Sequence, residues 1–264
     1  MAISPHSVIS DKAHLGKNVT IAPFCTIYED VIIGDNTCIG PNVSIYPGTR
    51  MGNNCKIFSG AALGAIPQDL KFNGEYTTLE IGDNVVIREY CTLNRGTKYH
   101  YKTVVDDNAL IMAYVHIAHD CIVGKNTILS NAVTLAGHVE IADYAIIGGM
   151  SAVHQFVKIG AHSMIGGGCL VRKDVPPFVR ASREPVSYIG VNAIGLRRRG
   201  YEASQITRIQ DIYRELFVNG SNVTNSMKRI LDELPNSSER TLILDFVNGS
   251  ERGIIRGLMT SLDQ

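Results

Sequence analysis

An aliphatic side chain recurs at every sixth position over most of the chain between Ile3 and Val171. A first run starts at Ile3 and ends at Leu63, a short run covers 81–93, and a third starts at Val105 and ends at Val171. A helix stripe repeats every three to four residues and a half-buried strand every two, so neither explains a period of six. The hexad positions are Ile3, Ile9, Leu15, Ile21, Ile27, Ile33, Ile39, Ile45, Met51, Ile57, Leu63, Ile81, Ile87, Leu93, Val105, Ile111, Ile117, Val123, Leu129, Leu135, Ile141, Ile147, Val153, Ile159, Ile165 and Val171.

A hexad predicts one flat side of a triangular coil, with the aliphatic residue pointing inward. Three hexads then close a coil of about 18 residues, and successive coils stack about 4.8 Å apart through parallel-sheet hydrogen bonds. Gly, Asn and Asp follow many of the inward residues. We expect them at the corners, where a positive φ is cheap for them. The sequence therefore predicts a mainly β fold built as a prism of stacked coils.

Two stretches interrupt the hexads. They are AIPQDLKFNGEYTT (65–78) and NRGTKYHYKT (94–103). We expect both to be loops that leave the prism, and long loops on a rigid scaffold often carry function.

The pattern changes after the last hexad. KDVPPFV (173–179) ends the coils with two prolines, and helical spacing begins at about residue 191. The first expected helix carries an apolar stripe of Ile206, Ile209, Ile212, Tyr213, Leu216 and Phe217. Further helices are expected at 224–234, at 237–248 and in the tail GIIRGLM (253–259). We therefore predict a β-helix domain over 1–190 and a helical domain over 191–264.

Composition excludes some classes of protein. The 25 basic and 25 acidic side chains cancel, which argues against nucleic-acid binding because such proteins usually carry a basic face. No signal peptide is recognisable at the start, and no apolar run is long enough to cross a bilayer, so we expect no stable membrane insertion. The six cysteines form no C-x-x-C pair, and we expect them to be reduced.

The period of 18 places several polar side chains together. Adding 18 to His119 gives Gly137, and adding 18 again gives Gln155, so these three residues are expected in one column. His138 and His154 lie one position to either side of it, beside small residues that leave the backbone open to a ligand. Taken singly, each of these histidines has an alternative interpretation as a solvated or hydrogen-bonded side chain with no role in a site. We leave His6, His14, His100 and His162, which fall outside this strip, as structural.

Seven motifs occur in an order that resembles a known family. The hexads themselves resemble the hexapeptide-repeat proteins, whose fold is a left-handed parallel β-helix and which are usually trimers. The motifs are IPQDLKFNGE (66–75), HIAHDC (116–121), LAGHV (135–139), IIGGMSAVHQF (146–156), IGAH (159–162), DVPPFV (174–179) and GVNAIGLRRRGY (190–201). Together they resemble the UDP-N-acetylglucosamine O-acyltransferases, which begin lipid A synthesis in Gram-negative bacteria, over nearly the whole chain.

The resemblance implies a reaction and its partners. An (R)-3-hydroxyacyl group passes from acyl carrier protein to the 3-hydroxyl of UDP-N-acetylglucosamine. The expected enzyme is a cytoplasmic homotrimer with active sites between subunits. No metal or other cofactor is expected, because the thioester is already activated and the donor carries its own phosphopantetheine.

The same resemblance implies roles for particular residues. His119 is the expected general base, Asp120 orients or stabilises its ring, and the backbone N–H of Gly137 is the oxyanion donor. Contacts to the sugar nucleotide and its surroundings are expected from His116, His138, His154 and Gln155, and contacts to the sugar or the acyl hydroxyl from Asp69 and Lys71. Asn192, Arg198 and Arg199 are expected on the uridine-diphosphate side.

Other positions refine this picture. Gly167 occupies the position that sets acyl-chain length in the family. The sequence departs from many relatives at Ile194, where an acidic residue is common, and from some at Asn94, where they have His. Carrier protein is acidic, so exposed Arg172, Lys173 and Arg180 are candidate docking residues.

Three alternatives stay open at this point. The pathway's later N-acyltransferase usually carries an extra N-terminal uridine-binding domain, whereas the hexads here begin at Ile3. A γ-carbonic-anhydrase-like metalloenzyme would bind a metal through the histidines, although H-x-x-H matches neither a closed zinc site nor the H-E-x-x-H pattern. A non-catalytic scaffold would keep its function without His119.

Overall fold

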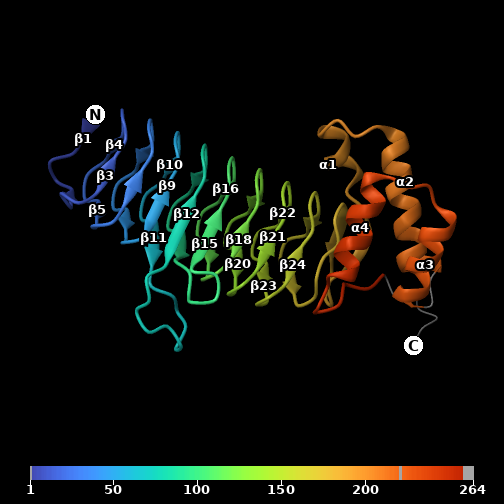
Figure 1. The fold of residues 1–264 in the computed structure, drawn as a ribbon. Helices are drawn as coiled ribbons and strands as arrows, with labels where there is room; N and C mark the ends of the chain where they lie inside the picture. Colours follow the sequence, from blue (N-terminus) through green and yellow to red (C-terminus); the bar gives the residue numbers. More distant parts are fainter. Residues whose placement is uncertain (1, 220–221, 258–264) are drawn as a thin grey trace.

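The computed structural model describes residues 2–219 and 222–257. Its main body is a stack of triangular coils made of short parallel strands, with helices gathered at the C-terminal end of the stack (Figure 1). Most strands are two residues long, because each hexad leaves room for one short strand before the next corner. In the part of the chain that the structure describes, the strands form three sheets, one for each side of the prism.

The first sheet consists of β1 (Ala2–Ile3), β4 (Thr20–Ile21), β7 (Cys38–Ile39), β10 (Lys56–Ile57), β13 (Val86–Ile87), β16 (Leu110–Ile111), β19 (Ile128–Leu129), β22 (Ile146–Ile147), β25 (Met164–Ile165), β27 (Val179–Ser182) and β28 (Ser187–Val191). The second sheet consists of β2 (Val8–Ile9), β5 (Thr26–Ile27), β8 (Ser44–Ile45), β11 (Ala62–Ala65), β14 (Thr92–Asn94), β17 (His116–Ile117), β20 (Thr134–Leu135), β23 (Ala152–Val153) and β26 (Leu170–Val171). The third sheet consists of β3 (His14–Leu15), β6 (Ile32–Ile33), β9 (Thr49–Met51), β12 (Thr78–Ile81), β15 (Lys102–Val105), β18 (Ile122–Val123), β21 (Glu140–Ile141) and β24 (Lys158–Ile159).

The register of the strands shows where the two interruptions fall. Ile117 pairs with Leu135, which is the spacing that three plain hexads give. Met51 pairs with Ile81 and Ile81 pairs with Val105, so both of these turns of the coil are longer than three hexads. The extra residues lie in 66–77 (the first loop) and 95–101 (the second loop). Both loops connect a strand of the second sheet to one of the third, so they leave the prism at the same corner (Figure 1).

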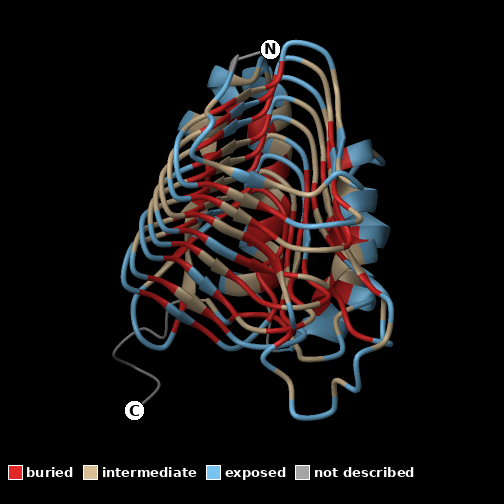
Figure 2. Cartoon of the chain, turned by 90° about the vertical axis from the view of Figure 1, so that its left-hand side faces the viewer, coloured by how far each residue is buried: buried red, intermediate tan, exposed pale blue. Residues whose placement is uncertain are grey.

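The inward aliphatic residues fill the prism. Almost all of them are buried, and Figure 2 shows these residues in red along the inside of the coils. Full burial of one such side chain stabilises the fold by about 1.5–3 kcal/mol. Ile9 and Leu15 are half-buried and Ile3 is 37% exposed, because the first coil has no neighbour on its outer side.

The corners differ from the prediction in one respect. Except at Gly64 (φ 82°), the glycine that directly follows an inward residue does not have a positive φ; that conformation falls two positions later, as at Asn18 and Asn36 (φ 57° each). Glycine at the earlier position is required by close approach instead, since a Cβ on Gly34 would collide with the backbone of Gly52 on the next coil. The asparagines therefore make the turn, and the glycines permit stacking.

The C-terminal part begins with an antiparallel hairpin of β27 and β28. Four α-helices follow within the described residues, with a π-helical turn after the second: α1 (Ala193–Arg198), α2 (Ala203–Arg214), η1 (Glu215–Asn219), α3 (Val223–Glu233) and α4 (Ser238–Asn248). The predicted apolar stripe packs inward, with Ile206, Ile209 and Ile212 all buried.

The predicted tail helix is wrong over 253–257. The Asp174 N–H donates to the Gly253 carbonyl (3.1 Å) and the Ile255 N–H donates to the Asp174 carbonyl (2.9 Å). The segment is extended because it closes the end of the prism by pairing with it. Residues 258–259 of that prediction lie outside the described residues.

The six cysteines are unpaired, and all but Cys38 are buried. Among the described residues, no helix is both long and apolar enough to cross a membrane.

Candidate active site

One corner of the prism carries most of the predicted chemistry. Successive turns from the second sheet to the third place His119 and Asp120 between β17 and β18, Gly137 and His138 between β20 and β21, and Gln155 between β23 and β24. The His138 N–H donates to the His119 carbonyl (3.0 Å), which locks neighbouring coils in this register. The two loops leave the same corner on the preceding coils, so they flank these residues.

His119 and Asp120 form a hydrogen-bonded pair. The His119 ring lies with Nδ1 2.8 Å from the Asp120 Oδ2 atom. Because a carboxylate accepts, Nδ1 is assigned as the donor and Nε2 keeps the lone pair that can take a proton. The His119 side chain is 13% exposed and that of Asp120 is fully buried. This geometry suits a general base whose ring is oriented from behind.

The second loop supplies further donors to Asp120. Its Oδ1 accepts the backbone N–H groups of Thr97 (3.0 Å) and His100 (3.1 Å), and its Oδ2 accepts the Thr97 hydroxyl (2.6 Å). Burial alone would raise the pKa of the Asp120 carboxyl, but the hydrogen bonds from His119, Thr97 and His100 outweigh it and lower that pKa to about 2. Asp120 is therefore a carboxylate at neutral pH.

Gly137 lies directly against the His119 ring. A Cβ atom built on Gly137 would be 2.6 Å from the Cε1 atom of His119 and 2.8 Å from Nε2. Any side chain at position 137 would therefore displace the ring. The predicted column of His119 and Gly137 is real, and the glycine backbone is the surface on which the imidazole packs.

His138 is surrounded by aromatic rings. It stacks on Phe156 (centroids 4.3 Å apart) and meets the edges of Tyr99 (4.5 Å) and His119 (4.9 Å). Burial lowers the pKa of His138, against the opposing effect of Asp120. Its Nδ1 atom is buried, has no hydrogen-bond partner and faces Asp120, 3.7 Å from Oδ2.

His116 precedes the pair on β17. Its Nδ1 atom lies 2.7 Å from the Thr92 hydroxyl, and burial together with the nearby His119 lowers the pKa of His116. His154 and Gln155 are exposed on the outer side of the last corner, with His154 Nδ1 3.2 Å from the Gln155 carbonyl.

A cavity of about 500 Å³ lies beside this corner. The first loop contributes Asp69, Lys71 and Glu75; Thr97, Lys98 and Tyr99 come from the second, and His138 and Phe156 from the prism. The structure thus brings Asp69 and Lys71 to the predicted site, as expected from the sequence. The Asp69 carboxylate accepts the Lys71 N–H (3.0 Å), which shapes the turn at the rim.

The remaining predicted residues occupy the other two corners of the same chain. Asn192 caps α1 and donates from Nδ2 to the His162 carbonyl (2.9 Å), and Arg199 donates to the Tyr144 carbonyl (2.9 Å), both at the corner between the third and first sheets. Arg198 is exposed on the same helix. Gly167 lies against Gly149 at the corner between the first and second sheets. Within one chain these residues do not meet His119.

Sequence reasoning missed the residues of the second loop. Thr97, Tyr99 and the His100 backbone all contact the site, and the only signal for them was the interruption of the hexads across 94–103. The two departures from the family pattern are also placed. Asn94 is buried and donates to the carbonyls of Ala65 and Ile66, where it anchors the first loop, and Ile194 is 61% exposed on α1.

His119, Asp120 and His138 also have the spacing of metal ligands, since their ligand atoms lie within 4.8 Å of one another. The Asp120 oxygens already accept two hydrogen bonds each. A metal ion would have to displace these donors, so the arrangement favours a base over a metal site.

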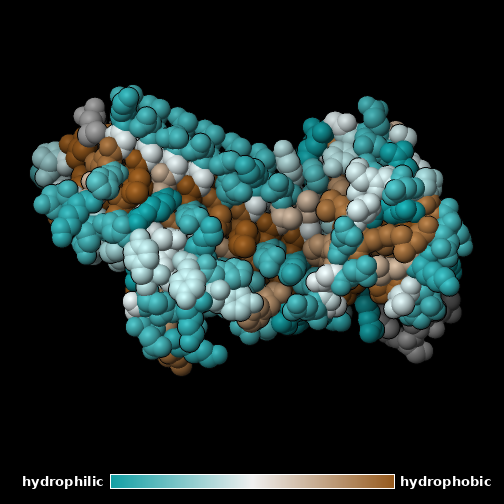
Figure 3. Space-filling model, viewed as in Figure 1, coloured by the Kyte–Doolittle hydropathy of each residue, from teal (hydrophilic) through white to brown (hydrophobic). Residues whose placement is uncertain are grey.

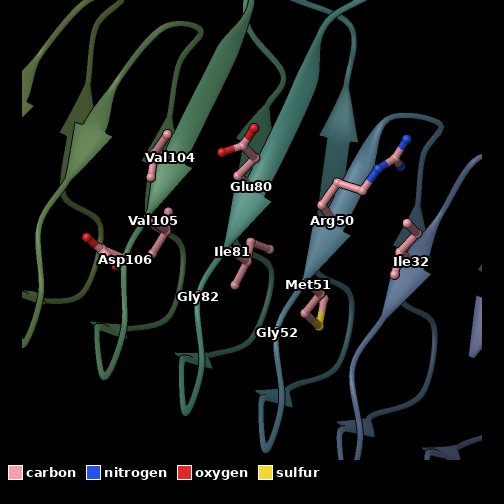
Figure 4. A pocket seen from close by; sticks show the side chains of 10 residues that line it. All are labelled: Ile32, Arg50, Met51, Gly52, Glu80, Ile81, Gly82, Val104, Val105 and Asp106. Atoms are coloured by element: carbon pink, nitrogen blue, oxygen red, sulfur yellow. The ribbon is translucent and has the colours of Figure 1, made fainter. Parts of the chain in front are cut away.

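A second hollow, of about 530 Å³, lies on the outer face of the third sheet (Figure 4). Its polar side chains are Arg50, Glu80 and Asp106, and none of the predicted site residues lines it. It is a shallow face of the prism and carries no acid–base pair like that of His119.

Comparison with known proteins gives one consistent result. The family model described as UDP N-acetylglucosamine O-acyltransferase, domain 2, matches residues 174–255, and the bacterial transferase hexapeptide model matches 12–46, 30–65 and 102–137. An acyl-[acyl-carrier-protein]–UDP-N-acetylglucosamine O-acyltransferase from Paracidovorax citrulli is 52% identical over 97% of this chain and 99% of its own. One from Sulfurihydrogenibium is 51% identical over 96% of this chain and 93% of its own.

Solved structures agree with these matches. A UDP-N-acetylglucosamine acyltransferase from Bacteroides fragilis superposes with a TM-score of 0.94 at 47% identity, covering 96% of this chain and 99% of its own. One from Campylobacter jejuni has a TM-score of 0.91 at 36% identity, covering 97% of this chain and 100% of its own. The expected left-handed parallel β-helix with a C-terminal helical part is confirmed. The chain belongs to the acyl-[acyl-carrier-protein]–UDP-N-acetylglucosamine O-acyltransferase family.

Proposed function

We propose that this protein transfers an (R)-3-hydroxyacyl group from acyl carrier protein to the 3-hydroxyl of UDP-N-acetylglucosamine, the first step of lipid A biosynthesis. The observation that carries the proposal is the His119–Asp120 pair packed on Gly137 beside a cavity. The full-length likeness to the O-acyltransferases supports the same substrates. We also infer a cytoplasmic enzyme, since the resemblance to the enzymes of lipid A synthesis in Gram-negative bacteria implies one.

The proposed mechanism uses the geometry of this corner. Nε2 of His119 takes the proton of the sugar 3-hydroxyl as that oxygen attacks the thioester carbonyl. The buried Asp120 carboxylate stabilises the imidazolium that forms. The backbone N–H of Gly137 donates to the oxyanion of the tetrahedral intermediate. Collapse breaks the C–S bond, and the His119 imidazolium returns its proton to the leaving thiolate. No metal or other cofactor enters this scheme.

Substrate contacts follow from the cavity. Asp69, Lys71 and His138 line it, and Asp69 and Lys71 are our candidates for binding the sugar or the hydroxyl of the acyl chain. His116, His154 and Gln155 lie along the same side of the prism and are the further candidates for the sugar nucleotide.

We further propose a homotrimer whose active sites lie between subunits. The candidate residues divide among three corners of one chain, so Asn192, Arg198, Arg199 and Gly167 reach a substrate at His119 only from a neighbouring copy. The first loop supports this arrangement, because it projects from the prism as an arm (Figure 3) with Leu70 fully exposed beside Asp69 and Lys71. Ile66 and Tyr76 of the same loop are also exposed, and several exposed apolar side chains on one arm fit contact with a second subunit.

Further residues are our candidates for contacting the acyl chain and the carrier protein. Gly167 is our candidate for setting acyl-chain length, and a Cβ there would already lie 3.1 Å from the Gly149 carbonyl oxygen. Arg172, Lys173 and Arg180 are exposed near the end of the prism, where Arg172 pairs with Glu184 (2.6 Å). These three are our candidates for docking acyl carrier protein.

The test is an acyl-transfer assay with UDP-N-acetylglucosamine and 3-hydroxyacyl carrier proteins of graded chain length. We expect wild-type protein to transfer one range of lengths, and His119→Ala to lose about 10²- to 10⁴-fold in turnover while still binding the sugar nucleotide. His14→Ala, an exposed histidine on the third sheet, is the matched control and should keep full activity. Near wild-type turnover by His119→Ala would overturn the base assignment; no transfer by wild type would overturn the function.

A further inference from the structure

The second loop has no place in the mechanism so far, yet it is built around Asp120. Ile81 and Val105 pair across this loop, whereas Ile117 and Leu135 pair across a plain turn of the coil, so the loop is one hexad of extra chain. The loop and the strand that follows it enclose Asp120 with hydrogen bonds. Thr97 and His100 bind the carboxylate, and the Thr103 hydroxyl accepts the Asp120 N–H (2.8 Å).

Thr97 makes the most direct of these contacts. Its hydroxyl donates to Oδ2, the same oxygen that accepts His119 Nδ1, at 2.6 Å, and its N–H donates to Oδ1 at 3.0 Å. Thr97 is 5% exposed and Asp120 is fully buried, so water does not replace this hydroxyl easily. Two donors from one residue therefore hold both oxygens and set the plane of the carboxylate.

We propose that Thr97 is a positioning residue for acyl transfer, which holds the Asp120 carboxylate in the orientation that aims His119 at the sugar hydroxyl. The inference rests on the proposed function, since the effect of changing Thr97 is measured in the same acyl-transfer reaction. Thr97 acts through Asp120. The second loop thus contributes to the chemistry by fixing Asp120, which in turn orients the His119 ring through Nδ1.

The Thr97 hydroxyl also weakens the attraction between the Asp120 carboxylate and the His119 ring. It shares Oδ2 with the imidazole, so its loss leaves that oxygen free to bind the protonated ring more strongly. The other titratable groups near this pair are His138, 3.7 Å from Oδ2, the His100 side chain stacked on Tyr99, the neighbouring Cys121, and His116, whose pKa is lowered by burial and by His119. A change at Thr97 is therefore expected to move the pH profile of the reaction as well as its rate.

The experiment compares Thr97→Val, Thr97→Ser and Thr127→Val with wild type. Valine keeps the shape of the threonine side chain but lacks its hydroxyl group, whereas serine keeps the hydroxyl group. Thr127 is a matched control, since it is fully buried and its hydroxyl donates to the Gly124 carbonyl (2.7 Å), in the turn between the third and first sheets. Steady-state kinetics are measured for each across pH, with thermal unfolding to verify folding.

We expect Thr97→Val to lose about 10- to 100-fold in kcat, the usual range for removing a group that orients a functional side chain, with the Michaelis constant for the sugar nucleotide unchanged. The acid limb of its pH–rate profile should move to higher pH. Thr97→Ser and Thr127→Val should retain wild-type kinetics. If Thr97→Val folds and matches wild type in kcat and pH profile, or if Thr127→Val loses as much, the inference is wrong even though wild type is active. Inactive wild-type protein would instead reject the proposed function.

Discussion

At the scale of single residues, the contact between Gly137 and His119 determines how much freedom the base has. A methyl group at position 137 would lie 2.6 Å from His119 Cε1, well inside van der Waals contact. We therefore expect Gly137→Ala to rotate the imidazole away from its productive orientation. A displacement of about 1 Å is enough to reduce the rate about 100-fold. The acyl-transfer assay measures this loss as a fall in kcat.

The control for this variant is Gly249→Ala at the end of α4, where a Cβ has its nearest neighbour at 3.3 Å and φ is −82°. It should leave turnover unchanged. Wild-type turnover by a folded Gly137→Ala protein would contradict the prediction that a methyl group at position 137 displaces the His119 ring.

At the scale of elements, an inward residue in the middle of the prism is supported by its own coil and the two adjacent ones, whereas one in the first coil has a single adjacent coil. Leu129 in β19 is fully buried between coils on both sides, whereas Leu15 in β3 is half-buried next to the open N-terminal end. We expect Leu129→Ala to lower the free energy of unfolding by about 2–5 kcal/mol, because it leaves a cavity that the stacked strands cannot close. Leu15→Ala should cost clearly less.

Urea denaturation followed by circular dichroism measures this difference. Equal losses for the two leucines would contradict the view that stability in the prism comes from coils contacting their neighbours.

At the scale of the whole molecule, His162 joins the helical part to the prism. Its ring lies between Tyr144 and Phe178, with Arg199 and Tyr201 of the helical part against its edge. Burial and the Arg199 charge lower the pKa of His162 to about 4. The unfolded chain binds a proton at this residue below about pH 6.5, whereas the folded protein does not until about pH 4. Stability should therefore fall as the pH drops from 6.5 to 4.

The matched variant is His162→Phe, because Phe156 and Phe178 already hold the same left-handed corner conformation (φ 62° and 65°). We expect its thermal midpoint to depend less on pH than that of wild type between pH 6.5 and 4. An unchanged slope in this window would rule out His162 as its source.

Much of the fold and part of the site could be predicted from the sequence because a solenoid converts sequence spacing into position. A count of six identified one row of buried side chains but not the second row two positions earlier, such as Val19 and Val31, and a count of 18 set His119 over Gly137. The same counting failed where the repeat is absent. Thr97 lies in a stretch with no hexad register, so nothing in the sequence predicted that it binds Asp120.

The sequence alone therefore determined the prism, the corner that carries the histidines and the order of the coils, since these follow from short-range periodicity. Tertiary structure decided the rest. It folded the second loop onto Asp120, paired the tail with the end of the prism, and put Arg199 on a corner away from His119. Those outcomes depend on contacts between segments with no common period, which only the folded chain brings together.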